Sequence, residues 1–327
     1  MTLDLVLVCP GCRTRTSGGE RLDVKTLERT GDVLACECGR RYPIVDGVPI
    51  VLADPAGFLR NEIAAIVERD LAPEVAALLV ADGPDDAPYP RMLEHLSTYL
   101  DAHWGDRTEP RSTGFAMQAL IAKLAGLPRV DAAVELGCST GRILAELAAR
   151  ADRVVGIDLQ FASVRRARRL LDGERLEFAR RIVGRHYASA AITPGDRTVP
   201  ASRRLLVCGD ALDPPLIPAV YPRVVALNLL DSVSRPRQLL SVIDGLCAPG
   251  GELILASPYA WASTVMHEGE RLGSADPAAV LETILTTGAG LGSRYRIEDA
   301  QDLPWSLRRD ARSRVSYQTH YLRARKL

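Results

Sequence analysis

A glycine-bearing turn between an apolar strand and a helix is the feature that most limits how this chain can fold. The run VELGCSTGR occupies residues 134–142, after a short apolar strand and before a helix predicted to continue to 150. Gly137 and Gly141 let the backbone approach a ligand closely, and the first helical turn offers free N–H groups. A dinucleotide-binding fingerprint would have the spacing GxGxxG, whereas this run is GxxxG. Alone, the turn is compatible with a ligand site or with an ordinary tight connection.

The chain alternates strands and helices on both sides of this turn. Strands are predicted at 131–137, 153–159, 204–210, 223–230 and 252–258, and helices at 113–126, 141–150, 161–172 and 235–247. The last segment, 315–325, alternates as an antiparallel strand does. Strands spaced by helices indicate a parallel sheet with right-handed crossovers. The predicted fold class is therefore α/β, with a doubly wound sheet.

Polar residues follow several of these strands. Asp158 ends the second strand, about 20 residues after the turn, where a carboxylate can accept hydrogen bonds from ribose hydroxyls. Asp210 ends the third strand, within reach of an adenine amino group, and Asn228 and Asp231 end the fourth. Open α/β sheets bind ligands at the carboxyl ends of their strands. These positions favour the ligand-site interpretation of the turn.

The runs ELGCSTG at 135–141 and VGID at 155–158 resemble motif I and its acidic follower in class I S-adenosylmethionine-dependent methyltransferases. GDA, LNLLDSV and APGGELILASPYAW then follow in the family's order, so the resemblance covers residues 113–327. It implies a seven-stranded, mostly parallel Rossmann-like sheet with an antiparallel last strand, and S-adenosyl-L-methionine as cofactor. Carried over by position, it assigns the cofactor contacts to Glu135, Gly137, Cys138, Ser139, Gly141, Asp158, Leu159, Gly209, Asp210, Ala211, Asn228 and Leu229.

Four cysteines gather in the first 40 residues, in the runs CPGC and CEC. Paired cysteines in a chain without a secretory signal indicate metal before disulfide, and four thiolates make a closed, structural zinc site. The segment 38–49 resembles a small zinc-binding family whose eukaryotic member activates several methyltransferases, although that family spaces its second pair as CxxC. We expect a zinc-ribbon-like domain at 1–55, the alternative being a metal-free unit. The predicted zinc ligands are Cys9, Cys12, Cys36 and Cys38.

Helical periodicity returns over 57–82 and 91–104, separated by a linker rich in proline and aspartate. We expect residues 56–112 to form a helical connector that covers the cofactor and helps to form the acceptor pocket. The methyltransferase domain would then occupy 113–327.

Candidate catalytic residues at the acceptor site each have a structural alternative. Asp231 could cap a turn, and His103 lies beside Tyr99 and Trp104 on a helix face that packing alone would explain. Tyr259 and Trp261 directly follow the fifth strand, above the expected methyl group. His186 and Tyr187 lie in a stretch, 173–203, that is predicted to be irregular. The candidates are Asp231, Tyr259, Trp261, His186, Tyr187 and His103.

The acceptor itself is less constrained. LNLLDSVSRPRQLL, PGGELILASPYAW and RLG at 271–273 are similar to the methyltransferase domain of ovothiol biosynthesis, which N-methylates the imidazole of a mercaptohistidine. The similarity implies a small-molecule or peptide acceptor, with nitrogen ahead of oxygen. Two alternatives stay open: an RNA base methyltransferase using the basic run RRARR at 165–169, and a non-catalytic scaffold whose zinc unit docks a partner protein.

Composition limits the partners. The 41 basic and 41 acidic residues balance, so no chain-wide field attracts nucleic acid or anionic lipid. No apolar run approaches the roughly 20 residues that span a bilayer, and the start does not have the pattern of a secretory signal. We expect a cytoplasmic enzyme with no membrane or nucleic-acid partner, and the sequence leaves its oligomeric state open.

Overall fold

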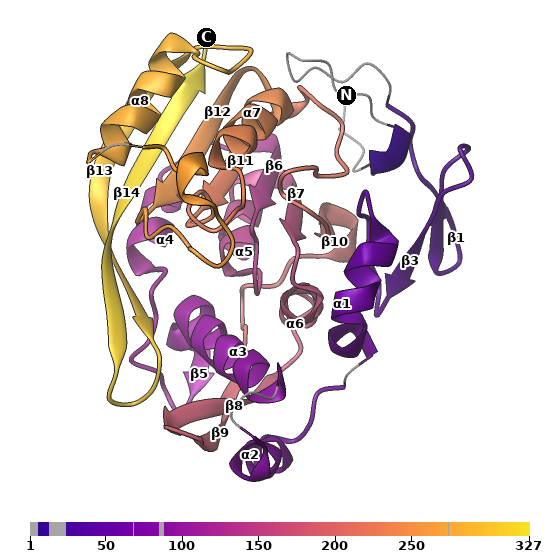
Figure 1. Cartoon of the computed structure of the whole chain (residues 1–327), viewed down its shortest axis with the longest axis vertical. Coiled ribbons are helices and arrows are strands. Elements are labelled where there is room, and N and C mark those ends of the chain that lie inside the picture. The colour runs from indigo at the N-terminus through magenta and orange to yellow at the C-terminus, as the bar shows by residue number, and fades with distance from the viewer. Residues whose placement is uncertain (1–5, 13–23, 68, 85–87, 274) are drawn as a thin grey trace.

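The computed structural model describes residues 6–12, 24–67, 69–84, 88–273 and 275–327. A central sheet has helices on both faces, with the amino-terminal unit at one edge and a long carboxyl-terminal hairpin at the other (Figure 1). Among the described residues, no helix is long and apolar enough to cross a membrane.

The central sheet has seven strands in the order β10-β7-β6-β11-β12-β14-β13. The first five are parallel, whereas β14 runs antiparallel to both β12 and β13. This confirms the predicted doubly wound, mostly parallel sheet. The strands are β6 Val130–Leu136, β7 Ala151–Asp158, β10 Arg204–Cys208, β11 Tyr221–Leu227, β12 Cys247–Ser257, β13 Tyr295–Arg308 and β14 Arg314–Lys326.

Both faces of the five parallel strands are largely buried, which is why these strands are mostly apolar, whereas β13 and β14 carry many polar and exposed residues. α4 Gln118–Ala125, α5 Arg142–Ala148 and α6 Phe161–Leu171 pack on one face. α7 Pro236–Leu246 and α8 Pro277–Thr287 pack on the other. Alternation sorts the side chains, so that Val154 joins the first core and its neighbour Val155 the second. Neither α8 nor β13 was among the elements predicted from the sequence.

The stretch predicted to be irregular, 173–203, contains a hairpin. β8 Leu176–Val183 pairs with β9 His186–Ile192, and β9 with the short β5 Thr108–Glu109. Arginines in β8 hide its strand pattern in the sequence. One of them, Arg180, is buried because its Nε donates to Asp101 Oδ1 at 3.0 Å.

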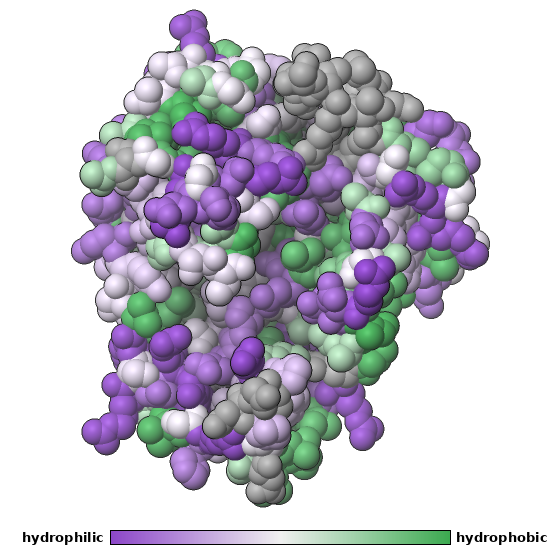
Figure 2. Space-filling view, viewed as in Figure 1, coloured by the Kyte–Doolittle hydropathy of each residue, from purple (hydrophilic) through white to green (hydrophobic). Residues whose placement is uncertain are grey.

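The connector forms three helices, α1 Pro55–Val67, α2 Pro73–Asp82 and α3 Pro88–Trp104. The single helix predicted over 57–82 is wrong, because Pro73 restricts the residue before it and begins a new helix. Apolar surface shows on the flank beside α1 and α2 (Figure 2). Ile66 of α1 is buried, whereas five large apolar side chains of α1 and α2 are exposed: Ile63, Val67, Val75, Leu78 and Leu79.

The amino-terminal unit is a four-stranded antiparallel sheet of β1 Glu28–Thr30, β2 Val33–Ala35, β3 Arg41–Val45 and β4 Val48–Pro49, preceded by a 3₁₀ turn at Pro10–Cys12. It lies against β10, where Val51 N donates to Cys208 O at 2.9 Å. An open edge strand is thereby covered. The domain boundaries at residues 55 and 112 stay predictions.

Candidate active site

A cavity of about 680 Å³ lies at the carboxyl ends of β6, β7, β10 and β11. α3 and the distal part of the β13–β14 hairpin complete its lining. This volume is within the range of about 300–1,000 Å³ typical of small-molecule sites. The predicted site residues that line it are His103, Glu135, Gly137, Ser139, Asp158, Leu159, Asp210, Ala211, Asn228, Leu229 and Asp231.

The glycine turn forms the floor of one half of the cavity. Gly137 and Gly141 have φ values of 78° and 79°, in the left-handed region that favours glycine. A Cβ on Gly141 would lie 2.9 Å from the Cβ of Ala167 in α6, so this glycine also permits close packing of α5 against α6. Cys138 is fully buried, and its N–H, like that of Gly137, donates to Ile157 O. Cys138, Gly141 and Gly209 therefore shape the backbone behind the cavity without lining it.

Two carboxylates face the cavity above the turn. Asp158 accepts hydrogen bonds from Ser139 N at 2.8 Å and Gln160 N at 2.9 Å, and burial raises its pKa. Glu135 is 2% exposed, and its Oε2 has no hydrogen-bond partner among the described residues. Burial, and then the charge of Asp158, raise the pKa of Glu135 well above its ordinary value. A buried carboxylate without a partner is costly, so this half of the cavity is built to receive a cationic or hydrogen-bond-donating ligand.

The loop after β10 supplies the side of the cavity expected to hold adenine. Gly209 N donates to Asp158 O at 3.0 Å, and Asp210 Oδ1 accepts from Leu212 N at 2.8 Å. The segment that follows β4 lies behind this loop, since a Cβ on Gly209 would be 3.4 Å from the carbonyl oxygen of Val51. The amino-terminal unit thus contacts the segment that carries Asp210.

The end of β11 brings two further polar side chains to the cavity. Asn228 has a φ of 53°, and its Nδ2 has no partner in the described part of the chain. Asp231 is 4% exposed, and its Oδ2 accepts from Ala260 N at 2.8 Å. Its Oδ1 is unpartnered among the described residues. Burial raises the pKa of Asp231, an effect that the Ala260 N–H partly offsets.

One face of α3 covers the cavity with the rings of His95, Tyr99 and His103. The ring centroids of His95 and Tyr99 are 4.4 Å apart, and those of Tyr99 and His103 are 6.2 Å apart. Burial, Arg142 and His95 lower the pKa of His103 to about 3, so its imidazole is neutral. His103 Nδ1 has no partner among the described residues. His95 was not predicted, but its spacing of four residues from Tyr99 places it on the same helical face.

The other side of α3 holds the helix in place. Asp101 is fully buried and accepts from Arg180 Nε at 3.0 Å and from Arg308 at 2.9 Å. Trp104 Nε1 donates to the carbonyl of Thr140, in the glycine turn, at 3.0 Å. These bonds join α3 to the β8–β9 hairpin, to β13 and to the turn itself.

Four predicted catalytic residues do not reach the cavity. Pro258, Ala260 and Ala262 line it, whereas Tyr259 and Trp261 do not. Tyr259 Oη instead contacts His320 Nδ1 at 2.8 Å. His186 is exposed on β9, and Tyr187 packs against a small apolar cluster of α2, α3 and β8. The Ala260 N–H donates to the Asp231 carboxylate and so joins this loop to the end of β11.

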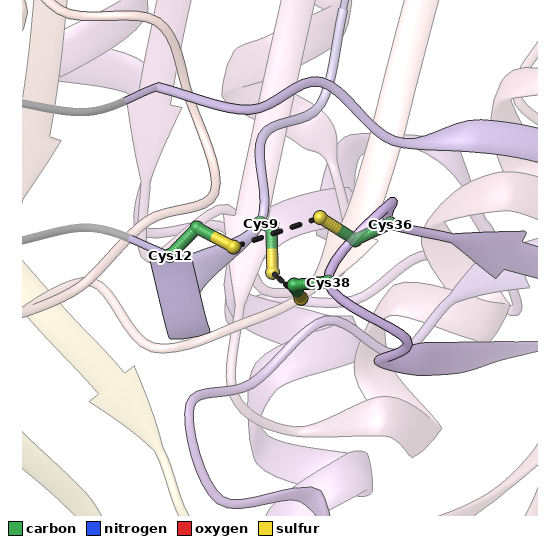
Figure 3. A group of neighbouring side chains, drawn as sticks. All are labelled: Cys9, Cys12, Cys36 and Cys38. Atoms are coloured by element: carbon green, nitrogen blue, oxygen red, sulfur yellow. Dashed lines mark hydrogen bonds between the residues drawn. The ribbon is translucent and has the colours of Figure 1, made fainter.

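The four amino-terminal cysteines form a separate cluster, drawn in Figure 3. Their Sγ atoms all lie within 4.8 Å of one another, with Cys9–Cys38 at 3.9 Å and Cys12–Cys36 at 3.6 Å. Tetrahedral zinc with bonds of about 2.3 Å to sulfur places its ligands roughly 3.8 Å apart. The cluster therefore has the donor set and the spacing that zinc requires.

Residues 134–255 match the family model of a methyltransferase domain. No curated protein is similar enough in sequence to match. Solved structures of similar fold include the N-methyltransferase NodS from Bradyrhizobium japonicum WM9, at 15% identity and a TM-score of 0.41, covering 64% of this chain and 93% of that one. Another is magnesium protoporphyrin IX methyltransferase from Synechocystis PCC 6803, at 15% identity and a TM-score of 0.41, covering 78% and 91%.

The matched residues include the glycine turn, Asp158, Asp210 and Asn228, all at the carboxyl edge of the sheet. The unpartnered Glu135 Oε2 and the ordered Asp158 carboxylate fit the charged and hydroxyl groups of S-adenosyl-L-methionine. The chain is an S-adenosyl-L-methionine-dependent methyltransferase, as its sequence predicted.

Proposed function

We propose that this enzyme methylates a nitrogen atom of a small molecule or peptide bound between α3 and Asp231. The observation that carries the proposal is one continuous cavity with two sets of polar groups. Glu135, Asp158 and Asp210 fit the cofactor, whereas His103 and Asp231 lie in the same cavity with unpartnered atoms left over for a second molecule. Resemblance to the mercaptohistidine N-methylating domain favours nitrogen, and an imidazole is one form it could take.

The bound cofactor supplies a methyl group already activated on a sulfonium. The protein aligns the acceptor and excludes water. Asp158 would hold the ribose and Glu135 the methionine moiety, while α3 closes the cavity above them. His103, held neutral by burial, can accept a hydrogen bond from an acceptor N–H through Nδ1 and so orient the nitrogen.

The RNA alternative has less support. The basic run of α6 is engaged within the protein, because Arg165, Arg166 and Arg169 all pair with Asp70. The scaffold alternative would leave the buried, unpartnered polar atoms of the cavity without a purpose.

Calorimetric binding of S-adenosylhomocysteine to the wild type and to Asp158→Ala tests the proposed cofactor contacts. Loss of the Asp158 contacts should cost about 1.5–3 kcal/mol, roughly 10- to 100-fold in affinity. Asp152→Ala is the matched control, because Asp152 lies on the same strand at its opposite, exposed end. Binding that weakens only in Asp158→Ala supports the site and justifies screening imidazole- and amine-bearing acceptors. A folded wild type that does not bind would put the scaffold alternative first.

We also propose that Cys9, Cys12, Cys36 and Cys38 hold a structural zinc ion. Four thiolates leave no open position for catalysis, so the metal would stabilise the unit that lies behind the Asp210 loop. Purified protein should contain about one equivalent of zinc, which Cys36→Ser should lose and Cys247→Ser should keep. Less than about half an equivalent in the wild type, with free thiols at all four positions, would overturn this proposal.

A further inference from the structure

The charge of the cavity limits which acceptors it can take. Glu135, Asp158, Asp210 and Asp231 line it, whereas no lysine or arginine does among the described residues. Arg142, which donates to His103 O at 3.4 Å, pairs with Asp106 at 2.5 Å and with Glu146 at 3.0 Å. His95 and His103 add no positive charge, since burial lowers the pKa of both.

Asp231 is the carboxylate left over once the cofactor contacts are assigned. It is 4% exposed, it lines the cavity, and its Oδ1 has no hydrogen-bond partner in the described part of the chain. Its other oxygen is held by Ala260 N, so the carboxylate has a fixed orientation. A buried carboxylate oxygen of this kind binds a charged N–H donor more strongly than a neutral one.

Aromatic rings accompany Asp231 in the same cavity. Tyr99, Trp305 and Tyr317 all contribute to its lining. Burial raises the pKa of the Tyr99 phenol, and the charges of Asp158 and Tyr317, followed by that of Asp231, add to the rise. The faces of such rings attract cations, most strongly where water is excluded. The Asp231 carboxylate and the aromatic rings therefore both favour a cationic ligand.

We infer that the acceptor is a nitrogen base that enters as a cation, an ammonium or imidazolium group, with no carboxylate or phosphate next to the reacting nitrogen. This inference rests on the proposed function. Asp231 accepts one proton from the cationic nitrogen. The freed lone pair then forms the new C–N bond while the C–S bond to the methyl group breaks, and its electron pair stays on sulfur. An anionic group in this position would meet Asp231 with no lysine or arginine among the described lining residues to offset the repulsion.

Calorimetry on protein saturated with S-adenosylhomocysteine tests the inference with matched probes. Histamine is compared with imidazole-4-acetate, and tyramine with 4-hydroxyphenylacetate. In each pair the cation should bind about 10-fold or more tightly than the anion. Asp231→Asn should abolish this preference while keeping S-adenosylhomocysteine affinity. Asp302→Asn, which removes an exposed carboxylate that does not line the cavity, should keep both.

The outcomes separate the two claims. Anions that bind as tightly as cations, cations that fail to bind, or a preference that survives in Asp231→Asn overturn the inference about the acceptor alone. A wild type that does not bind S-adenosylhomocysteine overturns the proposed function, and this inference with it.

Discussion

The two ends of the central sheet treat buried charge in opposite ways. Near the amino ends of its strands, Arg223 is fully buried and pairs with Glu252 at 2.6 Å. Arg223 also donates to Pro128 O at 2.8 Å and Arg150 O at 3.3 Å, just before β6 and β7 begin. At the carboxyl ends of the same strands, Glu135, Asn228 and Asp231 each keep an atom without a partner among the described residues.

This contrast separates stability from function within a single sheet. An unsatisfied buried polar group costs about 1–3 kcal/mol, so a fold tolerates several together only where a ligand completes them. At the amino ends of the strands, the buried polar groups bond to one another, so a change there should lower the stability of the fold. The carboxyl end should respond in the opposite way, losing ligand affinity before it loses stability.

Arg223→Met should have the largest effect. It leaves Glu252 buried without its main partner, which typically costs 3–5 kcal/mol, on the order of half the stability of a domain. Arg129→Met, which breaks an ion pair with Asp152 whose side chains are 56% and 54% exposed, should cost less than about 1 kcal/mol. Urea denaturation of the two variants measures the difference. Equal small losses would mean that the Arg223 pair contributes no more than a surface pair.

Glu135→Gln should reverse the pattern at the carboxyl end. S-adenosylhomocysteine affinity should fall about 10- to 100-fold in calorimetry, while the unliganded protein should be no less stable. Because the folded-state pKa of Glu135 is raised, its contribution favours folding at acid pH and is lost as pH rises through that pKa. The stability gain of Glu135→Gln should therefore grow from acid toward neutral pH. If the stability gain of Glu135→Gln became smaller between acid and neutral pH, the claim that the Glu135 carboxylate is buried without a partner would be contradicted.

The sequence predicted the carboxyl end better than it predicted the rest of the molecule. Gly137, Asp158, Asp210 and Asp231 could be placed because turn chemistry and strand ends are local features of the sequence, and all four line the cavity. The gathering of Cys9, Cys12, Cys36 and Cys38 followed from spacing in the same way.

What the sequence did not predict depends on contacts between distant segments. The ion pairs of Asp101 with Arg180 and Arg308 join residues 79 and 207 positions apart in the sequence. The local sequence of β8 therefore does not indicate that Arg180 is buried. Tyr259 and Trp261 were placed above the methyl group by position, whereas Pro258, Ala260 and Ala262 of the same loop line the cavity.

Trp104→Phe gives the smallest and most specific test of the contrast. It removes the Nε1 bond to Thr140 O but keeps a ring beneath the Arg142 guanidinium, which lies 5.3 Å from the Trp104 ring centroid. A single such bond contributes about 1 kcal/mol, so S-adenosylhomocysteine affinity should fall about 3- to 10-fold as α3 loosens from the glycine turn.

Tyr295→Phe is the matched change at the amino end, where Tyr295 Oη donates to buried Asp244 at 2.6 Å. It should lower the free energy of unfolding by a similar or greater amount and leave affinity unchanged. Calorimetry and urea denaturation on both variants give four numbers. The proposed contrast is wrong if Trp104→Phe lowers only stability, or if Tyr295→Phe lowers S-adenosylhomocysteine affinity. In either case, the position of a bond along the strands would not determine whether it supports stability or ligand binding.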